Sequence, residues 1–551
     1  MEIKDKLAEA IAAAATSAIE SGALPEAALP KVELSVPPKK EMGDFATNFA
    51  MQGARAFHKN PRQIANEIVS RIELAELDHA DIAGPGFINF YLKGDVLYDA
   101  LAAAMAAGDD YGNLPKKDVP PIMVEYVSAN PTGLLHVGHG RGAAMGSALV
   151  NLLRAAGYPV TSEYYINDAG NQIDHLAESV NARYLELLGK QCDFPEDGYK
   201  GADIIETARH IIDRDGDKYI AMDEKERVKI FKEIALKEKL QNLKDDLAAF
   251  HVTFDNWFSE RTLHQGKVKE AVEELRKNGV IYEKDGALWF RTTDYGDDKD
   301  RVVVRDNGEP TYFAADIAYH RDKFERGFGT LINIWGADHH GYVCRVKASL
   351  KALGYNPDNL TILFLQMVSL YRGGELVKMS KRTGEAVTLE ELMDDVGVDA
   401  ARYFFEMRSL DSQLDFDLDL AKKESSENPV YYIQYAHARI ASIRRQAKEN
   451  GLEEKSDVKL TLLTDESEVE LIKKIESYPE EIERAAKDYA PQRIARFAHE
   501  MAGLFHSFYT KCRIIGVDKE LAEARLALVI KAQQVIRHAL GVLGVSAPEK
   551  M

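Results

Sequence analysis

The 551-residue chain is poor in cysteine and has no long apolar segment. Its three cysteines, Cys192, Cys344 and Cys512, stand alone, without a CxxC pair or the spacing of a metal site. This usage is typical of a reduced, cytoplasmic protein without disulfide bonds. No apolar run approaches the roughly 20 residues that a membrane-spanning helix needs, so we expect no membrane partner.

Features of an export signal are missing as well. The stretch MEIKDKLAEAIAAAATSAIESG mixes acidic and basic residues over an alanine-rich helical pattern. It has neither the short apolar core nor the cleavage site of a secretory signal. We therefore expect a cytoplasmic protein.

An excess of basic residues is also absent. The formal net charge is −19, which argues against a general polyanion binder, and we expect no DNA partner. A local basic patch could still bind RNA. Apolar residues make up 45% of the chain and charged residues 29%, as in ordinary globular proteins. The length suggests roughly three or four domains.

Residues 1–115 have the pattern of a small α/β domain. We expect a helix over residues 4–21, the extended segment VELSVPP, a loop, a helix from about Phe45 and another in RQIANEIVSRI. The alternating GPGFINFYL predicts a strand. The turn-rich GDDYGNLPKKDVPP marks the end of this domain.

Residues 116–421 have the pattern of a parallel α/β domain. The strand IMVEYV is followed by a glycine-rich loop, a helix from about Arg141 and the strand YPVTSEYYIND. A charged helical stretch over about residues 172–276 precedes the next strand, LINIWGAD, so an insertion divides the sheet. Residues 422–551 show only helical spacing, which predicts an all-α domain.

The glycine-rich loop SANPTGLLHVGHGRG, residues 128–142, suits a phosphate ligand. Its glycines allow close approach to the backbone, and the free N–H groups of a helix start favour anions. His136 and His139 add two donors. The loop matches neither the Walker A motif nor the dinucleotide fingerprint. A plain glycine-rich turn with two incidental histidines is the alternative.

A second candidate loop is GGELVKMSKRTGE, residues 373–385. Its lysines, Lys378 and Lys381, lie three apart between glycine-bearing turns, an arrangement that can close on a polyphosphate. A solvated surface loop is the alternative.

Together the two loops resemble the paired motifs of class I aminoacyl-tRNA synthetases. Longer strings are similar to the arginyl-tRNA synthetase family throughout the chain: VEYVSANPTGLLHVGHGRG, EYYINDAGNQ, PTYFAADIAYH, WGADHHGYVCRVKA and NPVYYIQYAHARI. The resemblance implies a class I Rossmann-like catalytic domain at 116–421, an N-terminal domain at 1–115 that contacts the D-loop of tRNA, and an anticodon-binding helical bundle at 422–551.

The resemblance also implies the reaction. Arginine and ATP would form arginyl-adenylate and pyrophosphate, and the arginyl group would pass to the terminal adenosine of tRNA(Arg). Mg²⁺ would accompany the ATP phosphates, without a tightly bound protein metal site. The protein would be a monomer, and arginine activation would require bound tRNA.

Matched positions imply the ATP site. His136 and His139 would stabilise phosphates, Gly138 would lie against adenine, and Lys378 and Lys381 would be the second motif, with Lys381 nearer the departing pyrophosphate. Arg382 stands where the family usually has serine. The remaining implied ATP contacts are Gly336, Asp338 and His339 on the ribose side and Met367 and Val368 at adenine. By itself the string DHH, residues 338–340, suggests a pair of metal ligands, but the sequence has no third ligand at a suitable spacing. The whole first-motif region is Ala129, Asn130, Pro131, Thr132, Gly133, Leu134, Leu135, His136, Val137, Gly138 and His139.

An arginine site needs a carboxylate for the guanidinium fork. Tyr312 and Asp316 lie four apart, on one face of a predicted helix, and match the family's guanidinium-binding positions. A solvated helix acid is the alternative for Asp316. The other implied arginine contacts are Glu125, Ser128, Asn130 and His340.

Two regions match tRNA-contacting positions. Phe87 and Asn89 suit a splayed D-loop base, although Phe87 could equally be a core residue. The implied anticodon contacts are Tyr431, Tyr435, His437 and Arg439, some of which must pack in the core. Residues 439–448, RIASIRRQAK, supply a local basic face.

Three other interpretations compete with this one. HxGH also occurs in small nucleotidyltransferases, which are usually shorter and lack a long helical C-terminal region. An inactive RNA-binding paralogue is a second, against which both motifs argue. Another class I amino-acid specificity is the third, disfavoured by Tyr312, Asp316 and NPVYYIQYAHAR.

Overall fold

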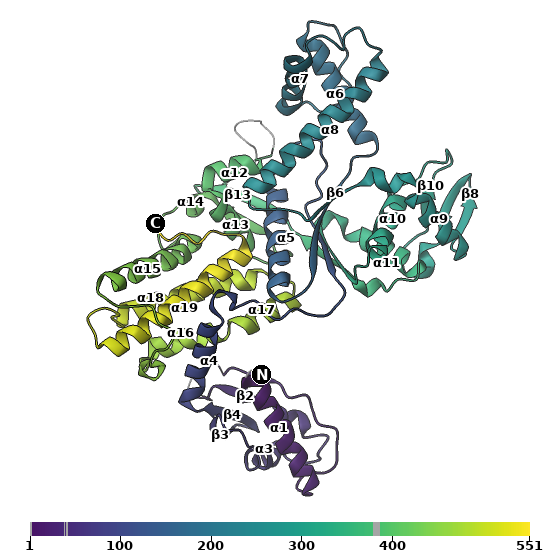
Figure 1. Cartoon of the computed structure of the whole chain (residues 1–551). Coiled ribbons are helices and arrows are strands. Elements are labelled where there is room, and N and C mark those ends of the chain that lie inside the picture. Colours follow the sequence, from purple (N-terminus) through teal and green to yellow (C-terminus); the bar gives the residue numbers. More distant parts are fainter. Residues whose placement is uncertain (1–2, 38, 40–41, 378–385) are drawn as a thin grey trace. The chain divides into compact units, whose positions relative to one another are not determined.

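The computed structural model describes residues 3–37, 39, 42–377 and 386–551. The chain forms two compact units: Met1–Ala106 with Ser456–Glu476, and Ala107–Lys455 with Ser477–Met551. Figure 1 shows the elements of each. The expected fold class, α/β with an all-helical C-terminal region, is confirmed.

The smaller unit is a four-stranded antiparallel sheet in the order β1-β2-β4-β3, with helices packed on one face. Ile11, Phe49, Ile64 and Phe90 are fully buried between the sheet and the helices. The elements are α1 (Ile3–Glu20), β1 (Leu34–Ser35), β2 (Phe45–Thr47), α2 (Phe49–Gly53), α3 (Pro61–Val69), β3 (Leu77–Ala83), β4 (Phe87–Leu92), α4 (Gly94–Ala106), the 3₁₀ turn Leu460–Leu462 and α16 (Glu466–Glu476).

The prediction of a helix from about Phe45 is wrong. Phe45–Thr47 forms β2, which pairs with β4, and the helix begins only at Phe49. The Thr47 hydroxyl donates to the carbonyl of Glu33 at 2.8 Å and accepts from the backbone N–H of Phe49. Long-range strand pairing therefore overrides the local helical preference.

A five-stranded parallel sheet in the order β12-β11-β5-β6-β7 is the centre of the larger unit. Its strands are β5 (Ile122–Glu125), β6 (Val160–Ile166), β7 (Asn256–Ser259), β11 (Thr330–Gly336) and β12 (Leu360–Leu365). The chain order reverses beside β5, which is where open parallel sheets bind ligands, at the carboxyl ends of the strands.

Two predictions in this unit need correction. Helix α5 (Val137–Ala155) begins four residues before the predicted start, so Gly138 and Gly140 also lie inside it. A Cβ on Gly140 would come within 2.8 Å of Leu389, so close packing explains why a helix tolerates this glycine. Strand β7 lies inside the stretch predicted to be wholly helical. Its short sequence, NWFS, has little periodicity by itself.

The helical part of the insertion is α6 (Asn171–Leu187), α7 (Ala202–Asp215) and α8 (Glu224–Ala249). After β7 come elements that the sequence did not predict, a small antiparallel sheet in the order β10-β9-β8 with its helix. Their bounds are α9 (Lys267–Lys277), β8 (Ile281–Lys284), β9 (Ala287–Phe290) and β10 (Arg301–Val304).

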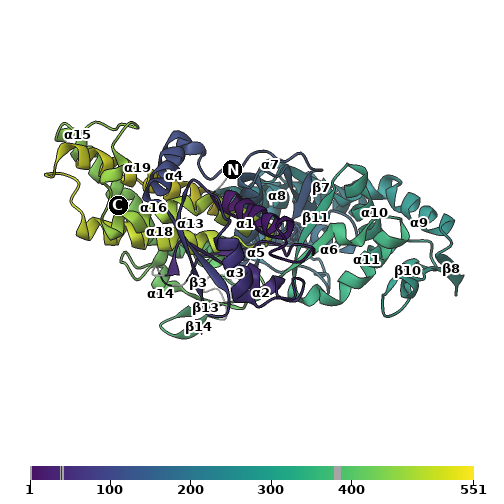
Figure 2. The ribbon, with the colours of Figure 1, turned by 90° about the horizontal axis from the view of Figure 1, so that it is seen from below.

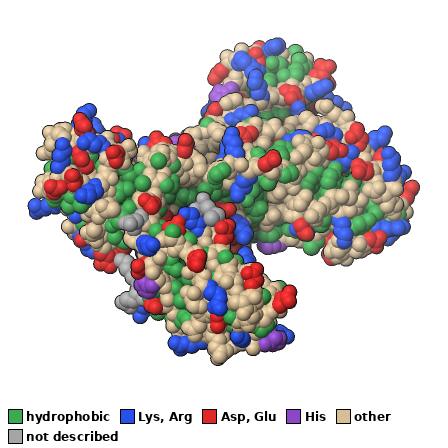
Figure 3. Space-filling model, turned by 60° about the horizontal axis from the view of Figure 1, so that its bottom comes forward, with side chains coloured by type: hydrophobic (Ala, Val, Ile, Leu, Met, Phe, Trp, Pro, Cys, Tyr) green, Lys and Arg blue, Asp and Glu red, His purple; other side chains and the backbone are tan. Residues whose placement is uncertain are grey.

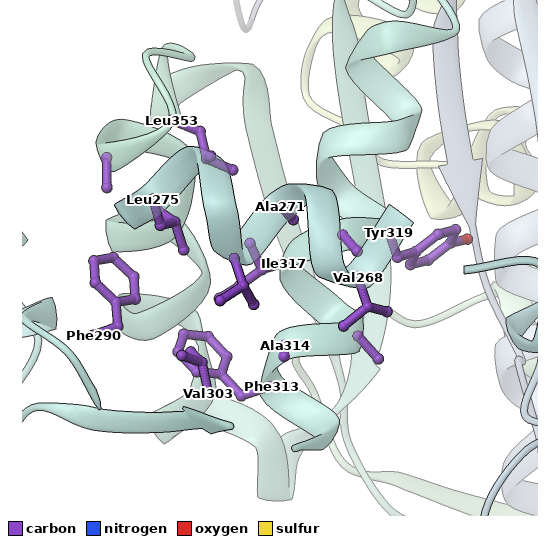
Figure 4. Packing of buried hydrophobic residues seen from close by; sticks show 14 of the residues in the cluster. Val268, Ala271, Leu275, Phe290, Val303, Phe313, Ala314, Ile317, Tyr319 and Leu353 are labelled. Carbon is purple, nitrogen blue, oxygen red and sulfur yellow. The ribbon is translucent and has the colours of Figure 1, made fainter. Parts of the chain in front are cut away.

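Helix α10 (Tyr312–Glu325) is held by an apolar cluster shown in Figure 4. Phe313 and Ile317 of α10 pack with Leu275 of α9, Phe290 of β9 and Val303 of β10. The small sheet and α9 thus fix the helix that carries Tyr312 and Asp316. Helix α11 (Val343–Ala352) follows β11.

A third sheet, in the order β14-β13-β15, follows the parallel one. Its elements and neighbours are β13 (Val368–Arg372), β14 (Glu375–Val377), α12 (Leu389–Val396), α13 (Val398–Glu406), β15 (Leu414–Asp417) and α14 (Leu418–Ala421). From Pro429 onward the larger unit has only helices: α15 (Pro429–Glu449), α17 (Tyr478–Lys487), α18 (Gln492–Lys511) and α19 (Lys519–Leu543). Figure 2 shows α15, α18 and α19 together, and all three contact one another.

Helix α19 is long and apolar enough, by length and composition alone, to cross a membrane. Its most apolar window is 72% buried inside the protein, among α5, α15 and α18. That burial is the pattern of a core helix, since an apolar helix all round is what a large core requires.

Candidate active site

Several functional segments meet at the carboxyl edge of the parallel sheet. Strand β5 ends at Glu125, β7 at Ser259 and β11 at Gly336, and α5 begins at Val137 after β5. Because the strands are parallel, these ends lie on one edge. The sequence predicted this convergence for β5 and β11, but not for β7.

His136 and His139 form a reciprocal cap on α5. The Nδ1 atom of His136 accepts from the Gly138 N–H at 3.1 Å, and the Nδ1 atom of His139 accepts from the His136 N–H at 3.3 Å. Their rings stack with centroids 3.7 Å apart. This arrangement satisfies helix-start donors that would otherwise face a ligand.

Both histidines are neutral at pH 7. Burial lowers the pKa of His136, and burial together with His136 lowers the pKa of His139 to about 3. Because each Nδ1 is an acceptor, the ring proton is on Nε2. Each side chain therefore offers one neutral N–H donor, suited to hydrogen-bond phosphate oxygens.

The capped turn is tied to the segment after the second candidate loop. The Val137 N–H donates to the carbonyl of Val387 at 3.1 Å, and the Leu389 N–H donates to the carbonyl of Leu135 at 2.7 Å. His136 and Thr388 thus face each other in an antiparallel bridge. Lys378 and Lys381 lie outside the described residues.

The link between β5 and α5 carries unusual backbone. Val127 and Ser128 have φ of 66° and 41°, in the left-handed region that a β-branched residue rarely adopts. The Ser128 hydroxyl donates to Glu125 Oε1 at 3.1 Å and accepts from the Tyr165 N–H at 3.1 Å. These bonds hold the strained turn, as is common at functional sites.

Glu125 belongs to a buried charge network. Its Oε2 accepts from Lys323 Nζ at 2.6 Å, and Lys323, which is fully buried, also donates to Asn333 Oδ1 at 3.1 Å. The Asn333 amide pairs with His320 at 2.9 Å. Sequence reasoning found Glu125 but missed Lys323, since a lysine in a helix gives no signal of burial.

Asp316 lies beside this network on α10. The Tyr342 hydroxyl donates to its Oδ2. Burial raises the pKa of Asp316 to about 7, and the nearby Glu125 and Glu260 add to the increase, whereas Tyr342 and Lys323 oppose it. Asp316 therefore lies close enough to two other carboxyl groups, and to one lysine, to interact with them electrostatically. That surplus of buried negative charge favours a cationic ligand.

Glu260 is a member of this acidic group that the sequence did not predict. It follows β7 directly and is buried. Because β7 itself was missed, nothing placed Glu260 at the sheet edge. Tyr312 is exposed at the start of α10, with its hydroxyl group near Gly170, and Asn130 is exposed in the loop before α5.

The predicted ATP contacts lie past β11 and β12. Gly336 precedes a 3₁₀ turn that carries Asp338 and His339, both exposed. His340, which was predicted to contact arginine, follows in the same turn, and its ring stacks on Phe364 of β12 with centroids 3.5 Å apart. Met367, 74% exposed, and Val368 follow β12.

Arg141 connects these ATP contacts to the histidine turn, a link that the sequence did not predict. It is fully buried, and it donates to the carbonyl of Gln366 at 3.0 Å and of Ser409 at 2.8 Å. The residue before Met367 is therefore fixed to the first turns of α5. Among the described residues, no group of three or more His, Cys, Asp or Glu side chains could hold a metal ion.

Comparison with known proteins identifies the family. Residues 101–423 match the model of the catalytic domain of class I (R) tRNA synthetases, residues 1–92 the arginyl-tRNA synthetase N-terminal domain, and residues 433–551 the DALR anticodon binding domain. The chain is 55% identical to an arginine–tRNA ligase of Carboxydothermus hydrogenoformans over 94% of each chain. The chain belongs to the arginyl-tRNA synthetase family.

Two further relatives agree with this. An arginine–tRNA ligase of Desulforamulus reducens is 51% identical over 100% of this chain and 99% of its own. An arginyl-tRNA synthetase structure from Thermus thermophilus shares the fold, with a TM-score of 0.77 and 22% identity over 100% of both chains. The resemblance expected from the motifs is therefore confirmed.

In the smaller unit of this family member, the predicted D-loop contacts lie on β4. Phe87 is 40% exposed, whereas Ile88 and Phe90 are fully buried. The core alternative for Phe87 therefore does not hold. Asn89 shares the strand face of Phe87 but is only 8% exposed, opposite Asp81 of β3.

In the larger unit, α15 carries an aromatic and cationic face. The rings of Tyr431 and Tyr435 are nearly parallel, with centroids 6.3 Å apart. The Arg439 guanidinium lies 5.1 Å from the Tyr435 ring and 5.2 Å from the ring of Tyr509 on α18. Tyr509 was not predicted. We call these four residues the α15 face.

His437 does not belong to the α15 face. It is 2% exposed, and its Nδ1 donates to the carbonyl of Pro548 at 2.9 Å. The structure thus gives it a packing position.

Charges of both signs are interspersed over the surface seen in Figure 3, so the acidic net charge does not form a single repulsive field there.

Proposed function

We propose that this chain is an arginine–tRNA ligase that uses ATP. The observation that carries the proposal is the group of carboxyl side chains Asp316, Glu125 and Glu260 at the sheet edge from which the turn of His136 and His139 also starts, in a member of this family. Carboxylates for the guanidinium and a turn with two neutral donors for phosphate are what arginine activation requires.

The first reaction joins arginine to AMP. A carboxylate oxygen of arginine attacks the α-phosphorus of ATP, the bond between that phosphorus and the bridging oxygen breaks, and pyrophosphate leaves with the electron pair. The Nε2–H groups of His136 and His139 would donate to the phosphate oxygens as charge builds up. No covalent enzyme intermediate is needed, so positioning and charge stabilisation determine the rate.

Arginine and ATP would bind to different groups of residues along the sheet edge. Asp316, with Tyr312, would bind the guanidinium, and Glu125, Ser128, Asn130 and His340 would surround the α-amino and carboxylate end. Gly138, Gly336, Asp338, His339, Met367 and Val368 would contact ATP. Lys378 and Lys381 would bind its phosphates. Mg²⁺ usually binds through substrate phosphates, and we propose that it enters with ATP.

The second reaction transfers arginine to tRNA(Arg). A ribose hydroxyl of the terminal adenosine attacks the carbonyl carbon of the adenylate, the ester bond forms, AMP leaves and the hydroxyl proton is released to solvent. Phe87 and Asn89 would contact the D-loop, and the residues of the α15 face would contact the anticodon. We propose functional domains at 1–115, 116–421 and 422–551, and a monomer that acts in the cytoplasm.

Arginine-dependent ATP–pyrophosphate exchange tests the proposal. We expect exchange with arginine and tRNA together, but not with lysine, which lacks a planar fork. Exchange without tRNA would contradict the requirement for tRNA but would still support the assignment as an arginine–tRNA ligase. No exchange under either condition, from folded protein that still binds tRNA, would favour an inactive RNA-binding paralogue.

A further inference from the structure

A single buried guanidinium on α13 joins the ends of two distant helices. Arg402 is fully buried, and its Nε and Nη2 atoms donate to the carbonyl of Leu543 at 2.9 and 2.7 Å, where α19 ends. Its Nη1 donates to the carbonyl of Phe250 at 3.0 Å, where α8 ends. Helix C-termini favour cations because their last carbonyls lack partners.

The same guanidinium reaches the helix that carries the histidine turn. Arg402 Nη2 donates to Ser147 Oγ at 2.8 Å, in the middle of α5, and Ser147 itself donates to the carbonyl of Ala144 at 3.0 Å. Glu406 supplies the opposite charge at 3.0 Å. Gly544 makes room, because a Cβ there would come within 2.5 Å of Arg402.

Helix α13 has a second contact with α5, close to the catalytic turn. A Cβ on Gly140, the residue after His139, would lie 3.3 Å from the Phe405 ring. At its other end α13 binds the C-terminal region, since Asp399 accepts from the Ser546 N–H at 2.9 Å and from Gln434 of α15 at 2.8 Å. One short helix therefore contacts α5, α15 and the end of α19.

From this geometry we infer that Arg402 is a positioning residue, which through Ser147 makes the alignment of the histidine turn depend on the C-terminal helices. The inference rests on the proposed function, in which α5 presents His136 and His139 to ATP and the C-terminal helices bind the anticodon. Anticodon contacts would then affect the rate of the chemical step, and not only tRNA affinity.

A purely structural role for Arg402 predicts something different. Loss of packing would lower activity equally for every tRNA, because it acts on the folded fraction. Loss of coupling instead reduces the factor by which the correct anticodon raises kcat. The ratio of kcat for intact tRNA(Arg) transcript to kcat for a transcript with a replaced anticodon separates the two.

Ser147→Ala is the variant of choice, because it removes the bond to Arg402 and keeps the contacts of Arg402 with α8 and α19. Ser349→Ala is the matched control. Ser349 is also a buried helical serine that donates to the carbonyl three residues back, Val346, at 2.7 Å, but no guanidinium of the residues that the structure describes is hydrogen-bonded to it. Charging rates are measured per active site by burst titration.

We expect the kcat ratio in Ser147→Ala to fall by about fivefold or more, the lower end of usual coupling between sites, with KM for arginine unchanged. Ser349→Ala should keep the wild-type ratio. Arg402→Lys retains the charge but cannot reach all its acceptors, so its ratio should fall as well. A wild-type ratio of one, or an unchanged ratio in Ser147→Ala, overturns the inference. Wild-type protein that does not charge tRNA with arginine overturns the proposed function, and the inference with it.

Discussion

At the edge of the parallel sheet, charged side chains are buried and bonded to one another, whereas on the α15 face they are partly exposed and lie over aromatic rings. Glu125 and Lys323 pair in the interior, and Asp316 is held beside them. Arg439 instead lies against Tyr435 and Tyr509. Buried charge can select one small cation, whereas exposed rings can stack on any base. The first surface suits a fixed substrate and the second a flexible loop of RNA.

The largest expected effect is on the chemical step at the sheet edge. His139→Ala removes a phosphate donor from a helix that tolerates alanine, so kcat for pyrophosphate exchange should fall by about 10²–10³-fold. Arginine affinity, measured by calorimetry, should stay the same. His210→Ala, an exposed position on α7, is the control. An equal loss in His210→Ala would contradict the role of His139.

The second largest effect distinguishes arginine binding from ATP binding. Asp316→Asn preserves shape but removes the charge that would pair with the guanidinium, so KM for arginine should rise by about 10- to 150-fold. KM for ATP should change little. Asp338→Asn, on the ATP side, should show the reverse pattern in the same steady-state assay. Equal changes in both constants for Asp316→Asn would refute its assignment.

On the α15 face, the effect should appear only with tRNA. Tyr435→Ala removes a stacking ring, which we expect to raise KM for tRNA by about tenfold and, if the coupling through Arg402 holds, to lower the rate of pyrophosphate exchange at saturating tRNA as well. His437 lies two residues further along α15, on its buried side, so His437→Ala should lower the melting temperature instead. If His437→Ala weakened tRNA binding as much as Tyr435→Ala, the distinction between face and core would be wrong.

The smallest effect concerns pH. Burial raises the pKa of Asp316 to about 7, so below pH 7 the free protein must release a proton before a guanidinium can pair with it. Arginine affinity should therefore fall as the pH drops from 8 to 6, by at most about tenfold per unit. Calorimetry in two buffers of different ionisation enthalpy would detect the released proton.

In the upper part of this range, between pH 8 and 7, the α15 face should be unaffected. The bond to Tyr435 raises the pKa of Arg439, and burial lowers the pKa of His506 beside it, so neither changes charge between pH 7 and 8. Fluorescence titration of the protein with tRNA at pH 7 and pH 8 measures whether tRNA affinity stays constant.

Arginine binding that showed no proton release would contradict the assignment of Asp316 to the guanidinium site.

Much of the architecture could be predicted because it is locally encoded. The patterns of α1, β5, β6 and the C-terminal helices identified the elements, and the paired motifs identified the family. Strand β7 and the start of α5 were missed, since NWFS is too short to show a period and glycine normally argues against a helix. The loss of β7 hid Glu260. His437 was predicted to contact tRNA although it is buried, because helical spacing does not distinguish a core position from an exposed one.

The sequence by itself determined the class of fold, the order of its domains, the family and most of the residues at the sheet edge, because these depend on short strings and on periodicity. Only the tertiary structure decided the protonation of His139, the buried pairing of Glu125 with Lys323, the acidity of Asp316 and the joint at Arg402. Each of these depends on desolvation and on neighbours far apart in the chain, and an amino-acid string does not report either.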